Sequence, residues 1–372
     1  MGKGVLVAMS GGVDSSVTAG LLVREGYECT GVFMCLGSPT KTFEDRQASK
    51  DGTNHPGCCS PEDSRDARDV AACLGMKFSV LNFQNELEGI IRYFVDEYRR
   101  ARTPNPCIMC NSRLKFGKLM QYAEAIGADY VATGHYAQIR QMNGEARLGR
   151  GVDNKKDQSY ALFGVRREDL ARIKLPLGEY TKPEVRKIAA EMNLPVRDKA
   201  ESQEICFVAD DDYARLVAER APELCKAGAV VDAEGRQIGE HQGIFHYTIG
   251  QRRGLGIARG EPVYVIRLDA ETNTVVLGTG EQLKQKRLAG DGVNWHVEPE
   301  PAGEFRAMVQ IRYNHRGAMG TVRPVADEQG KMSRVEVEFD VPVRAITPGQ
   351  AAVFYDENQS IIGGGWIRGI DY

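Results

Sequence analysis

The first 135 residues alternate between short apolar runs and longer amphipathic stretches. The apolar runs predict buried strands at 5–9, 30–34, 78–83 and 130–133. Apolar residues recurring every three or four positions predict helices at 15–25, 62–74, 86–100 and 116–126. Strands that alternate with helices are typical of an α/β fold with a parallel sheet covered on both faces. Such sheets bind ligands at the carboxyl ends of their strands.

The pattern changes beyond about residue 205. Residues 232–236 and 269–273 have the composition of hairpin turns, and period-two alternation predicts strands at 308–313, 320–324, 335–339 and 351–355. Short alternating strands favour a small barrel or sandwich. We therefore expect an α/β domain over 1–204, a small β-rich central domain over 205–288 and a C-terminal β-barrel over 289–372. One more helix, at 185–192, follows a capping box at 181–184, and the polar stretch 36–57 predicts a long loop.

Composition sets limits on this picture. Of 372 residues, 42% are hydrophobic and 27% charged, and the net charge is -3, so any nucleic-acid binding must come from local basic patches. No apolar run approaches the roughly 20 residues that a membrane helix needs. The chain enters its first strand almost at once, which leaves no room for a signal peptide and predicts a cytoplasmic protein. Nine irregularly spaced cysteines favour chemical or metal-binding thiols over a disulfide framework.

A glycine-rich turn, Ser10-Gly-Gly-Val-Asp-Ser-Ser16, joins the first strand to the first helix. Its glycines let the backbone approach a phosphate closely, and the helix N-terminus supplies N–H groups and a positive dipole end. Asp14 would repel phosphate, so we expect it to hold Mg²⁺ on a leaving pyrophosphate. A Walker A ending is absent, which disfavours γ-phosphate transfer. The alternative is a tight strand–helix turn without a ligand.

Cys107 and Cys110 form a Cys-x-x-Cys pair after Thr103-Pro-Asn-Pro106, whose prolines predict a shaped loop. Between residues 99 and 118 there are six Arg or Lys and no Asp or Glu. This basic setting predicts a lowered thiol pKa and a nucleophilic thiolate. The alternative is a pair of buried, unreactive cysteines.

Other polar residues are weak signals when taken singly. They are Cys206, His135, the cluster Lys156-Asp-Gln-Ser159, Arg312-Tyr313 and Gln350. Each alone is more often a core cysteine, a structural histidine, a turn or a surface side chain than a functional residue.

Together, these segments resemble the tRNA-specific 2-thiouridylases of the PP-loop ATP pyrophosphatase superfamily, along essentially the whole chain. The matching segments are Met9-Ser-Gly-Gly-Val-Asp-Ser-Ser16, Gly31-Val-Phe-Met34, Thr103-Pro-Asn-Pro106 with Cys110-Asn111, Ala132-Thr-Gly-His-Tyr136, Lys156-Asp-Gln-Ser-Tyr160, Ile205-Cys-Phe207, Gly239-Glu-His-Gln-Gly243, Ile249-Gly-Gln-Arg252 with Gly254-Leu-Gly-Ile257, Arg312-Tyr313 and Thr347-Pro-Gly-Gln350.

The resemblance implies a tRNA-uridine 2-sulfurtransferase, which replaces the 2-oxo group of the wobble uridine by sulfur. ATP adenylates that oxygen with release of pyrophosphate, and a cysteine persulfide supplies sulfur as AMP leaves. It implies that Cys206 carries the persulfide and Cys110 is the partner nucleophile, and that the two can end as a disulfide. Direct persulfide attack and release of free sulfide both stay open. A persulfide is more acidic and more nucleophilic than a thiol, which suits either route.

The resemblance also assigns the three domains and their contacts. It makes the first domain catalytic, the central one a linker and the barrel a tRNA-binding domain. The implied ATP contacts are Ala8, Met9, Ser10, Gly11, Gly12, Val13, Asp14, Ser15, Met34 and Gly134; the target-base residues are Asn105, Pro106 and Cys107; and the tRNA contacts are His135, Lys156, Asp157, Gln158, Arg312, Tyr313 and Gln350. The implied partners are tRNAs for Lys, Glu and Gln and a sulfur-donor protein, either a relay protein or a cysteine desulfurase. We expect a monomer with no membrane contact.

One departure from the family pattern suggests a metal. Many members have Asp where this chain has Cys107, and Cys58 and Cys59 follow the long loop. Cys58, Cys59, Cys107 and Cys110 are therefore candidate ligands for zinc or an iron–sulfur cluster, with reduced free thiols as the alternative. In a cluster, Cys110 would be a ligand instead of a free nucleophile.

Two other functions compete with this one. The first is another PP-loop ATP pyrophosphatase, such as a small-molecule amidating ligase or a different tRNA thiolase, which a glutaminase domain or an added RNA-binding module would favour. The second is an RNA-binding protein that retains only the nucleotide fold, in which Cys110→Ser and Cys206→Ser would leave function intact.

Overall fold

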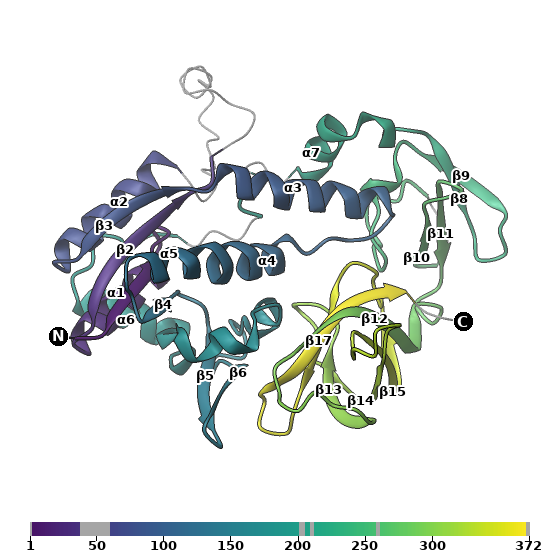
Figure 1. Cartoon of the computed structure of the whole chain (residues 1–372). Coiled ribbons are helices and arrows are strands. Elements are labelled where there is room, and N and C mark those ends of the chain that lie inside the picture. The colour runs from purple at the N-terminus through teal and green to yellow at the C-terminus, as the bar shows by residue number, and fades with distance from the viewer. Residues whose placement is uncertain (1, 38–59, 201–204, 209–211, 258–260, 370–372) are drawn as a thin grey trace, which may run out of the picture. The chain divides into compact units, whose positions relative to one another are not determined.

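A computed structural model describes residues 2–37, 60–200, 205–208, 212–257 and 261–369 (Figure 1). The chain forms two compact units, one of residues 1–90 and 107–211 and one of residues 91–106 and 212–372. We describe each unit by itself.

The first unit is built on a five-stranded sheet of order β3-β2-β1-β4-β7. Its strands are β1 (Gly4–Ala8), β2 (Glu28–Cys35), β3 (Lys77–Asn82), β4 (Tyr130–Ala132) and β7 (Ile173–Lys174). All neighbouring pairs are parallel. This confirms the predicted α/β sheet. The prediction missed β7, because two residues are too few to show a period.

The helices α1 (Val13–Arg24), α2 (Pro61–Cys73) and α6 (Lys182–Glu191) share one apolar core with this sheet. Val17 and Leu22 of α1, Val70 of α2 and Val185 of α6 are buried in it beside Val7 of β1. The capping box before α6 is present, since the Glu184 carboxylate accepts from the backbone N–H of Thr181 at 2.7 Å. The helix begins at Lys182, three residues before the predicted start.

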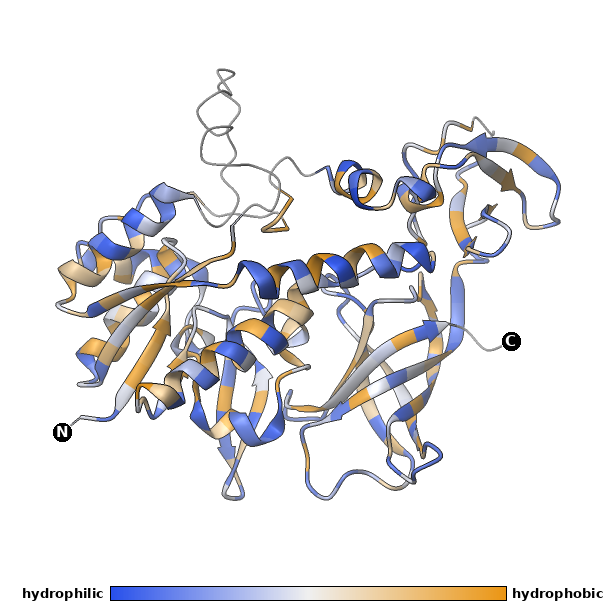
Figure 2. Ribbon diagram, turned by 45° about the horizontal axis from the view of Figure 1, so that its top comes forward, coloured by the Kyte–Doolittle hydropathy of each residue, from blue (hydrophilic) through white to orange (hydrophobic). Residues whose placement is uncertain are grey.

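Helix α3 (Gln84–Arg99) is amphipathic, as predicted. Its buried side chains recur every three or four residues (Leu87, Ile90, Ile91, Phe94, Val95 and Tyr98). Figure 2 shows the resulting alternation of hydrophobic and hydrophilic bands along it. Among the described residues, no helix is both long and apolar enough to cross a bilayer.

The Cys-x-x-Cys pair lies on a helix, which corrects the predicted loop. Helical structure runs through α4 (Pro106–Met109), a π-helical stretch η1 (Cys110–Lys118) and α5 (Leu119–Ala125). It begins ten residues before the predicted start of 116, because Pro106 occupies the first turn, where its missing N–H costs nothing. π-helical segments are rare and are frequent at functional sites, and this one starts at Cys110.

A hairpin and short 3-10 helices complete the first unit. Strands β5 (Ala137–Met142) and β6 (Glu145–Arg150) meet at Asn143-Gly144, both with positive φ, as a tight hairpin turn requires. Three 3-10 helices follow: η2 (Ser159–Leu162), η3 (Arg167–Arg172) and η4 (Pro176–Glu179).

The second unit contains a small mixed sheet and a closed barrel. After α7 (Tyr213–Arg220) and η5 (Pro222–Leu224), the sheet has the order β10-β11-β8-β9. Its elements are β8 (Gly228–Val231), β9 (Gln237–His241), η6 (Ile244–His246), β10 (Tyr264–Asp269) and β11 (Thr274–Gly278). The barrel closes in the order β12-β15-β14-β13-β16-β17, which confirms the C-terminal β-barrel.

The barrel strands are β12 (Lys284–Trp295), β13 (Phe305–Gln310), β14 (Ala318–Val325), β15 (Arg334–Arg344), β16 (Ala351–Tyr355) and β17 (Ile361–Gly369). Along β15, buried Val335, Val337 and Phe339 alternate with more exposed charged residues, which is the period that predicted the strand. These side chains fill the barrel together with Trp295 and Phe354.

Candidate active site

The glycine-rich loop lies between buried β1 and helix α1. Gly12 is the N-cap residue of α1, with extended backbone and no side-chain cap. Gly11 has φ +74, and a Cβ atom there would lie 2.3 Å from the carbonyl oxygen of Asp63. Only glycine fits this position, because α2 passes directly against the loop. The structure therefore presents a helix N-terminus behind a bare backbone, the arrangement that favours phosphate.

Hydroxyl groups hold this loop in shape. Ser15 Oγ and Ser16 Oγ both donate to the carbonyl oxygen of Gly12, at 3.1 and 2.8 Å. The backbone N–H of Ser10 donates to Ser15 Oγ at 3.1 Å. Ser16 is fully buried, while Ser10 is exposed. Ser10 is thus the serine of this loop best placed to meet a ligand, and Ser15 and Ser16 pre-form its backbone.

Asp14 is paired with two residues that the sequence analysis did not single out. Its Oδ1 accepts from Lys182 Nζ at 2.7 Å and from the Tyr136 hydroxyl at 2.8 Å. Lys182 is 8% exposed and lies 5.8 Å from the centre of the Tyr136 ring. The sequence around Lys182 predicts only a helix cap and gives no sign of its contact with Asp14.

This pairing limits how Asp14 would bind Mg²⁺. The Lys182 ammonium beside Asp14 Oδ1 already balances the charge of the carboxylate. Among the described residues, no group of three or more His, Cys, Asp or Glu is arranged to hold a metal. Mg²⁺ is commonly held by one or two carboxylates plus substrate phosphates. The described residues at this loop fit an ion that arrives on ATP, with Asp14 as its one ligand from the loop.

A second lysine ties the loop to α2. Lys199 Nζ donates to the carbonyl oxygen of Gly11 at 3.1 Å and to Asp63 Oδ1 at 2.6 Å, and it also contacts Asp66. Burial lowers the pKa of Lys199 but the two carboxylates outweigh it, so the net shift is upward and the ammonium form is favoured. Asp63 is itself held by the N-cap residue Ser60.

The other predicted ATP contacts lie at the same sheet edge. Met34 is the last residue but one of strand β2, and Gly134 follows β4 by two residues. A Cβ atom on Gly134 would lie 2.9 Å from Asp14 C and Ser15 N, so this glycine lets β4 approach the start of α1. Ala8, Met9 and Val13 are buried and support the loop from below.

Three cysteines lie near one another in the first unit. Cys107 is exposed, and Cys110 and Cys206 are half-buried. Burial raises the pKa of Cys110 to about 11, and the charge of Cys206 raises it further while Lys115 opposes both. The pKa of Cys107 is likewise raised, because desolvation and the charge of Cys206 outweigh the opposing charge of Lys115. The predicted lowering of the thiol pKa is therefore wrong: burial outweighs the basic stretch.

The remaining metal candidates, Cys58 and Cys59, lie outside the described residues.

His135 is buried and neutral. Its Nδ1 lies 2.7 Å from Thr133 Oγ1 and its Nε2 lies 3.5 Å from Lys115 Nζ. An ammonium only donates, so Nε2 accepts and Nδ1 carries the hydrogen. Burial and Lys115 hold the pKa of His135 well below its usual 6.5. Because His135 is only 7% exposed, its contact with Lys115 indicates a role in positioning that lysine, and its predicted contact with tRNA stays a prediction.

The cluster around Asp157 also has a structural role. Asp157 is 9% exposed and accepts from the N–H groups of Gly151 and Ser159 and from Arg150. Gln158 Oε1 accepts from the N–H of Tyr136 at 3.0 Å, which fixes the tyrosine that contacts Asp14. Lys156 is half-buried, so its predicted contact with tRNA stays a prediction.

In the second unit, Gln350 and Arg312 bind backbone carbonyls. Gln350 Nε2 donates to the carbonyl oxygens of Thr103 and Pro104 at 3.0 and 3.1 Å, directly before Asn105. Arg312 donates to the carbonyl oxygen of Arg344 at 3.0 Å, while Tyr313 beside it is 44% exposed. Gln350 thus secures the segment that leads to the predicted target-base residues: half-buried Asn105, buried Pro106 and exposed Cys107.

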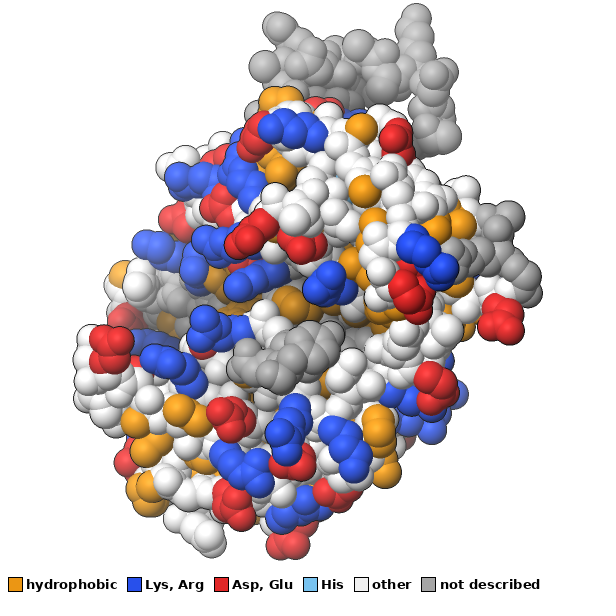
Figure 3. Space-filling view, turned by 90° about the vertical axis from the view of Figure 1, so that its right-hand side faces the viewer, with side chains coloured by type: hydrophobic (Ala, Val, Ile, Leu, Met, Phe, Trp, Pro, Cys, Tyr) orange, Lys and Arg blue, Asp and Glu red, His pale blue; other side chains and the backbone are white. Residues whose placement is uncertain are grey.

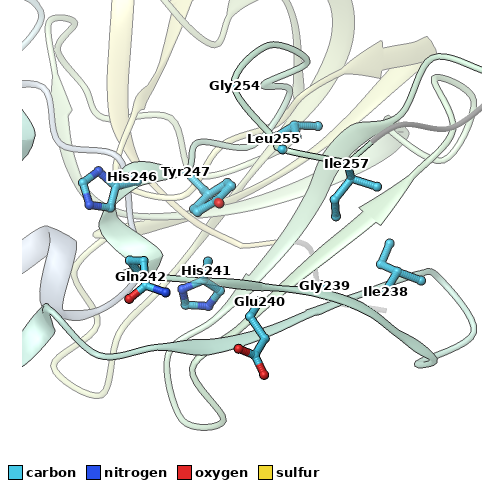
Figure 4. A pocket seen from close by; sticks show the side chains of 11 residues that line it. Ile238, Gly239, Glu240, His241, Gln242, His246, Tyr247, Gly254, Leu255 and Ile257 are labelled. Carbon is cyan, nitrogen blue, oxygen red and sulfur yellow. The ribbon is translucent and has the colours of Figure 1, made fainter.

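A cavity of about 590 Å³ lies beside β9 and the 254–257 turn (Figure 4). His241 on its wall uses both ring nitrogens, since Nε2 lies 3.0 Å from the carbonyl oxygen of Asn273 and Nδ1 accepts from the N–H of Gly243. The motif at 239–243 therefore fastens β9 to the 273 turn, and His241 is not available as a metal ligand.

A net charge of -3 means that the protein has no global basic field, so RNA binding would depend on local basic clusters. On the face drawn in Figure 3, Lys and Arg side chains gather in a band with Asp and Glu interspersed. An RNA partner would meet local basic clusters and no uniform field.

Comparisons with known proteins cover the whole chain. Family models match residues 3–210 (tRNA methyl transferase HUP domain), 216–279 (tRNA methyl transferase PRC-barrel domain) and 285–367 (aminomethyltransferase beta-barrel domain). The chain is 45% identical to the tRNA-specific 2-thiouridylase MnmA of Rhodopirellula baltica, over 98% of this chain and 96% of that protein. It is 47% identical to the MnmA of Carboxydothermus hydrogenoformans, over 98% of both.

One of the matching solved structures has a low sequence identity. An NMN synthetase from Francisella tularensis is 19% identical, with a TM-score of 0.32 over 64% of this chain and 79% of that chain, which is too low to support an inference. The sequence matches are decisive: with its α/β unit, its central domain and its barrel all matched in order, the chain belongs to the family of enzymes named tRNA-specific 2-thiouridylases.

Proposed function

We propose that this chain catalyses ATP-dependent 2-thiolation of the wobble uridine in tRNA. The observation that carries the proposal is that one compact unit contains both the phosphate-type loop at Ser10–Ser16 and the thiols of Cys107, Cys110 and Cys206. Lys199 contacts Gly11, and Cys206 follows seven residues later. Seven residues span at most about 25 Å, so the chain keeps the Cys206 thiol within reach of the loop.

In the first half-reaction, the uridine O2 attacks the α-phosphorus of ATP and the bond to pyrophosphate breaks. The N-terminus of α1 would bind the phosphates, and Lys182 would stabilise the charge that develops on pyrophosphate. Mg²⁺ bound to ATP would neutralise part of the same charge. Tyr136 and Lys182 would hold the Asp14 carboxylate in place through the two hydrogen bonds to its Oδ1.

In the second half-reaction, sulfur reaches C2 of the adenylated uridine as the C2–O bond breaks and AMP leaves. In the direct route the terminal sulfur of a Cys206 persulfide attacks C2. The Cys110 thiolate then attacks Cys206 Sγ, so that the S–S bond breaks and the transferred sulfur stays on C2. In the sulfide route Cys110 first displaces hydrosulfide, which attacks C2. Both routes end in a Cys110–Cys206 disulfide, which an external thiol reductant must reduce. With its pKa at about 11, Cys110 needs a proton acceptor at neutral pH.

The proposal also includes partners. The wobble base would be flipped out of its loop into the site. We infer that tRNAs for Lys, Glu and Gln are the substrates, that a sulfur-donor protein charges Cys206, and that the cytoplasmic protein acts as a monomer. We further propose domain boundaries at residues 204 and 288, with the barrel as the tRNA-binding domain. Lys156, Arg312 and Tyr313 are the proposed direct tRNA contacts.

The experiment that tests the activation step is ATP–pyrophosphate exchange with and without tRNA. We expect exchange to require tRNA. Asp14→Asn and Lys182→Met should each reduce the exchange rate at least about 100-fold. Cys206→Ser should leave exchange intact, because sulfur transfer comes later. Exchange without tRNA would instead support an amidating ligase. Exchange lost in Cys206→Ser would contradict the assigned order of steps.

A further inference from the structure

The motif Thr248-Ile-Gly-Gln-Arg252 has no role in the reaction described so far. It forms a tight turn: the Gln251 N–H donates to the Thr248 carbonyl at 2.9 Å, and Gln251 Oε1 accepts from the Thr248 N–H at 3.0 Å. Gly250 has φ +90, and its N–H donates to the carbonyl oxygen of Val265 in β10. The turn is therefore rigid, and it presents Arg252 as an exposed side chain.

Arg252 lines a cavity of about 620 Å³ in the second unit. The cavity walls come from three parts of that unit: the 248–252 turn with Tyr264, the barrel residues Arg312, Arg344, Ala345, Thr347 and Gln350, and Thr103 with Leu283. Three of the lining residues are arginines, and none of the described lining residues is acidic. Such a pocket concentrates positive charge without an internal counter-charge.

The arginines are held at the cavity wall in different ways. The Arg344 guanidinium lies 5.1 Å from the centre of the Tyr264 ring, a cation–π arrangement. Arg312 donates to the carbonyl oxygen of Arg344. Among the described residues, neither Arg252 nor Arg344 forms an ion pair with an acidic side chain. Their charge is therefore available to a ligand.

We propose that this cavity binds a backbone phosphate of the tRNA substrate, next to the nucleotide that undergoes reaction, through Arg252 and Arg344. This inference rests on the proposed function and deepens it. Arginine is the preferred partner of phosphate because its planar fork donates two parallel hydrogen bonds. The cavity volume of about 620 Å³ falls within the usual range of ligand pockets, about 300–1,000 Å³, and is large enough for a nucleotide.

Position favours RNA over a free nucleotide. Thr103 on the cavity wall is two residues before Asn105, the first proposed target-base residue, and two residues span at most about 7 Å. Gln350, also on the wall, fixes the intervening carbonyls. A phosphate bound here would lie close to a base held by Asn105, as the phosphate of a neighbouring nucleotide must. Free ATP has its own loop in the other unit.

The test is tRNA binding measured by fluorescence anisotropy over a range of salt concentrations. Arg252→Ala and Arg344→Ala are compared with wild type and with Arg323→Ala, an exposed barrel arginine that pairs with Glu304 and Glu338. We expect each pocket variant to bind tRNA about 10-fold more weakly and to lower the salt slope by roughly one, as loss of one phosphate contact does. Arg252→Lys should recover part of the affinity. Arg323→Ala should match wild type.

Unchanged tRNA affinity and slope in both pocket variants would overturn the proposal, as would failure of the wild type to bind tRNA. A parallel measurement of the KM for ATP separates the two phosphate sources: a rise in this KM with unchanged tRNA affinity would mean a free-nucleotide site and would also overturn it. The proposed function is tested separately, by thiolation with the wild type. Tight, Arg252-dependent tRNA binding without thiolation would refute the function and leave the phosphate site standing.

Discussion

The ammonium group of Lys199 donates a hydrogen bond to the carbonyl oxygen of Gly11, at 3.1 Å. The same group contacts Asp63 and Asp66 on α2. Lys199 thereby joins three segments that are distant in sequence: the phosphate-type loop, helix α2 and the segment that leads to Cys206. Lys199 would therefore link ATP bound at the loop to the segment that we propose carries the sulfur.

Lys199→Met is predicted to raise the KM for ATP about 10-fold, because the loop loses the donor that fixes Gly11. It should also lower the free energy of unfolding by about 1–3 kcal/mol, since Asp63 keeps its buried position without a cation. ATP–pyrophosphate exchange and urea unfolding measure the two effects.

Lys199→Arg separates positioning from simple stability. It should restore most of the stability but only part of the ATP affinity, because the planar fork places its donors differently. Lys187→Met on α6, an exposed lysine, serves as the control and should change neither quantity. A Lys199→Met enzyme with the wild-type KM for ATP would refute the positioning role.

Gly11→Ala is predicted to destabilise the first unit and abolish ATP binding. The new Cβ would lie 2.3 Å from the Asp63 carbonyl oxygen at a φ of +74, so both backbone and α2 must shift. We expect a loss of about 2–4 kcal/mol in unfolding free energy. Gly89→Ala in α3, where a Cβ meets nothing within 4 Å, should instead gain about 0.5–1 kcal/mol. Equal stabilities for the two variants in urea titration would contradict this prediction.

The Cys110 thiol is predicted to be unreactive at neutral pH in the free enzyme. Burial raises its pKa to about 11, so the thiolate is a small fraction of the whole at pH 8. Peptide mapping of iodoacetamide-treated protein should show slower alkylation of Cys110 than of exposed Cys225. The Cys110 rate should keep rising toward pH 11. A plateau below about pH 9 would show that Lys115 dominates over burial, as the basic sequence had suggested.

Buried His135 predicts a loss of stability on acidification. The pKa of His135 in the folded protein is well below 6.5. Below pH 6.5 this histidine therefore binds a proton in the unfolded chain but stays neutral in the folded one. The expected contribution is a loss of about 1.4 kcal/mol per pH unit below 6.5. In His135→Gln, urea unfolding between pH 7.5 and 5.5 should show a correspondingly smaller dependence. Identical pH dependence in both proteins would mean that His135 protonates freely in the fold.

The strand–loop–helix start of the chain was predictable because β1 is a clear apolar run and two adjacent glycines before a helix are typical of a phosphate-binding loop. The barrel was predictable because its strands alternate with period two. Lys182 and Lys199 were not, since their roles depend on Asp14 and Gly11, more than 160 residues away. The helical position of Cys110 was missed because two prolines in the segment before it suggested a loop.

The pKa of the Cys110 thiol also could not be predicted from the sequence. The sequence displays the six basic residues between 99 and 118, but it does not show how deeply Cys110 is buried. Desolvation depends on atoms brought together by the whole fold, whereas charge can be counted along the chain.

The central claim is tested most directly by nucleoside analysis of tRNA from cells that lack the gene for this protein. The account predicts that 2-thiouridine derivatives disappear from the wobble position of these tRNAs. The wild-type gene should restore them, and genes carrying Cys110→Ser or Cys206→Ser should not, whereas Cys225→Ser should. Undiminished 2-thiouridine in the deletion strain, or full restoration by Cys206→Ser, would contradict the account.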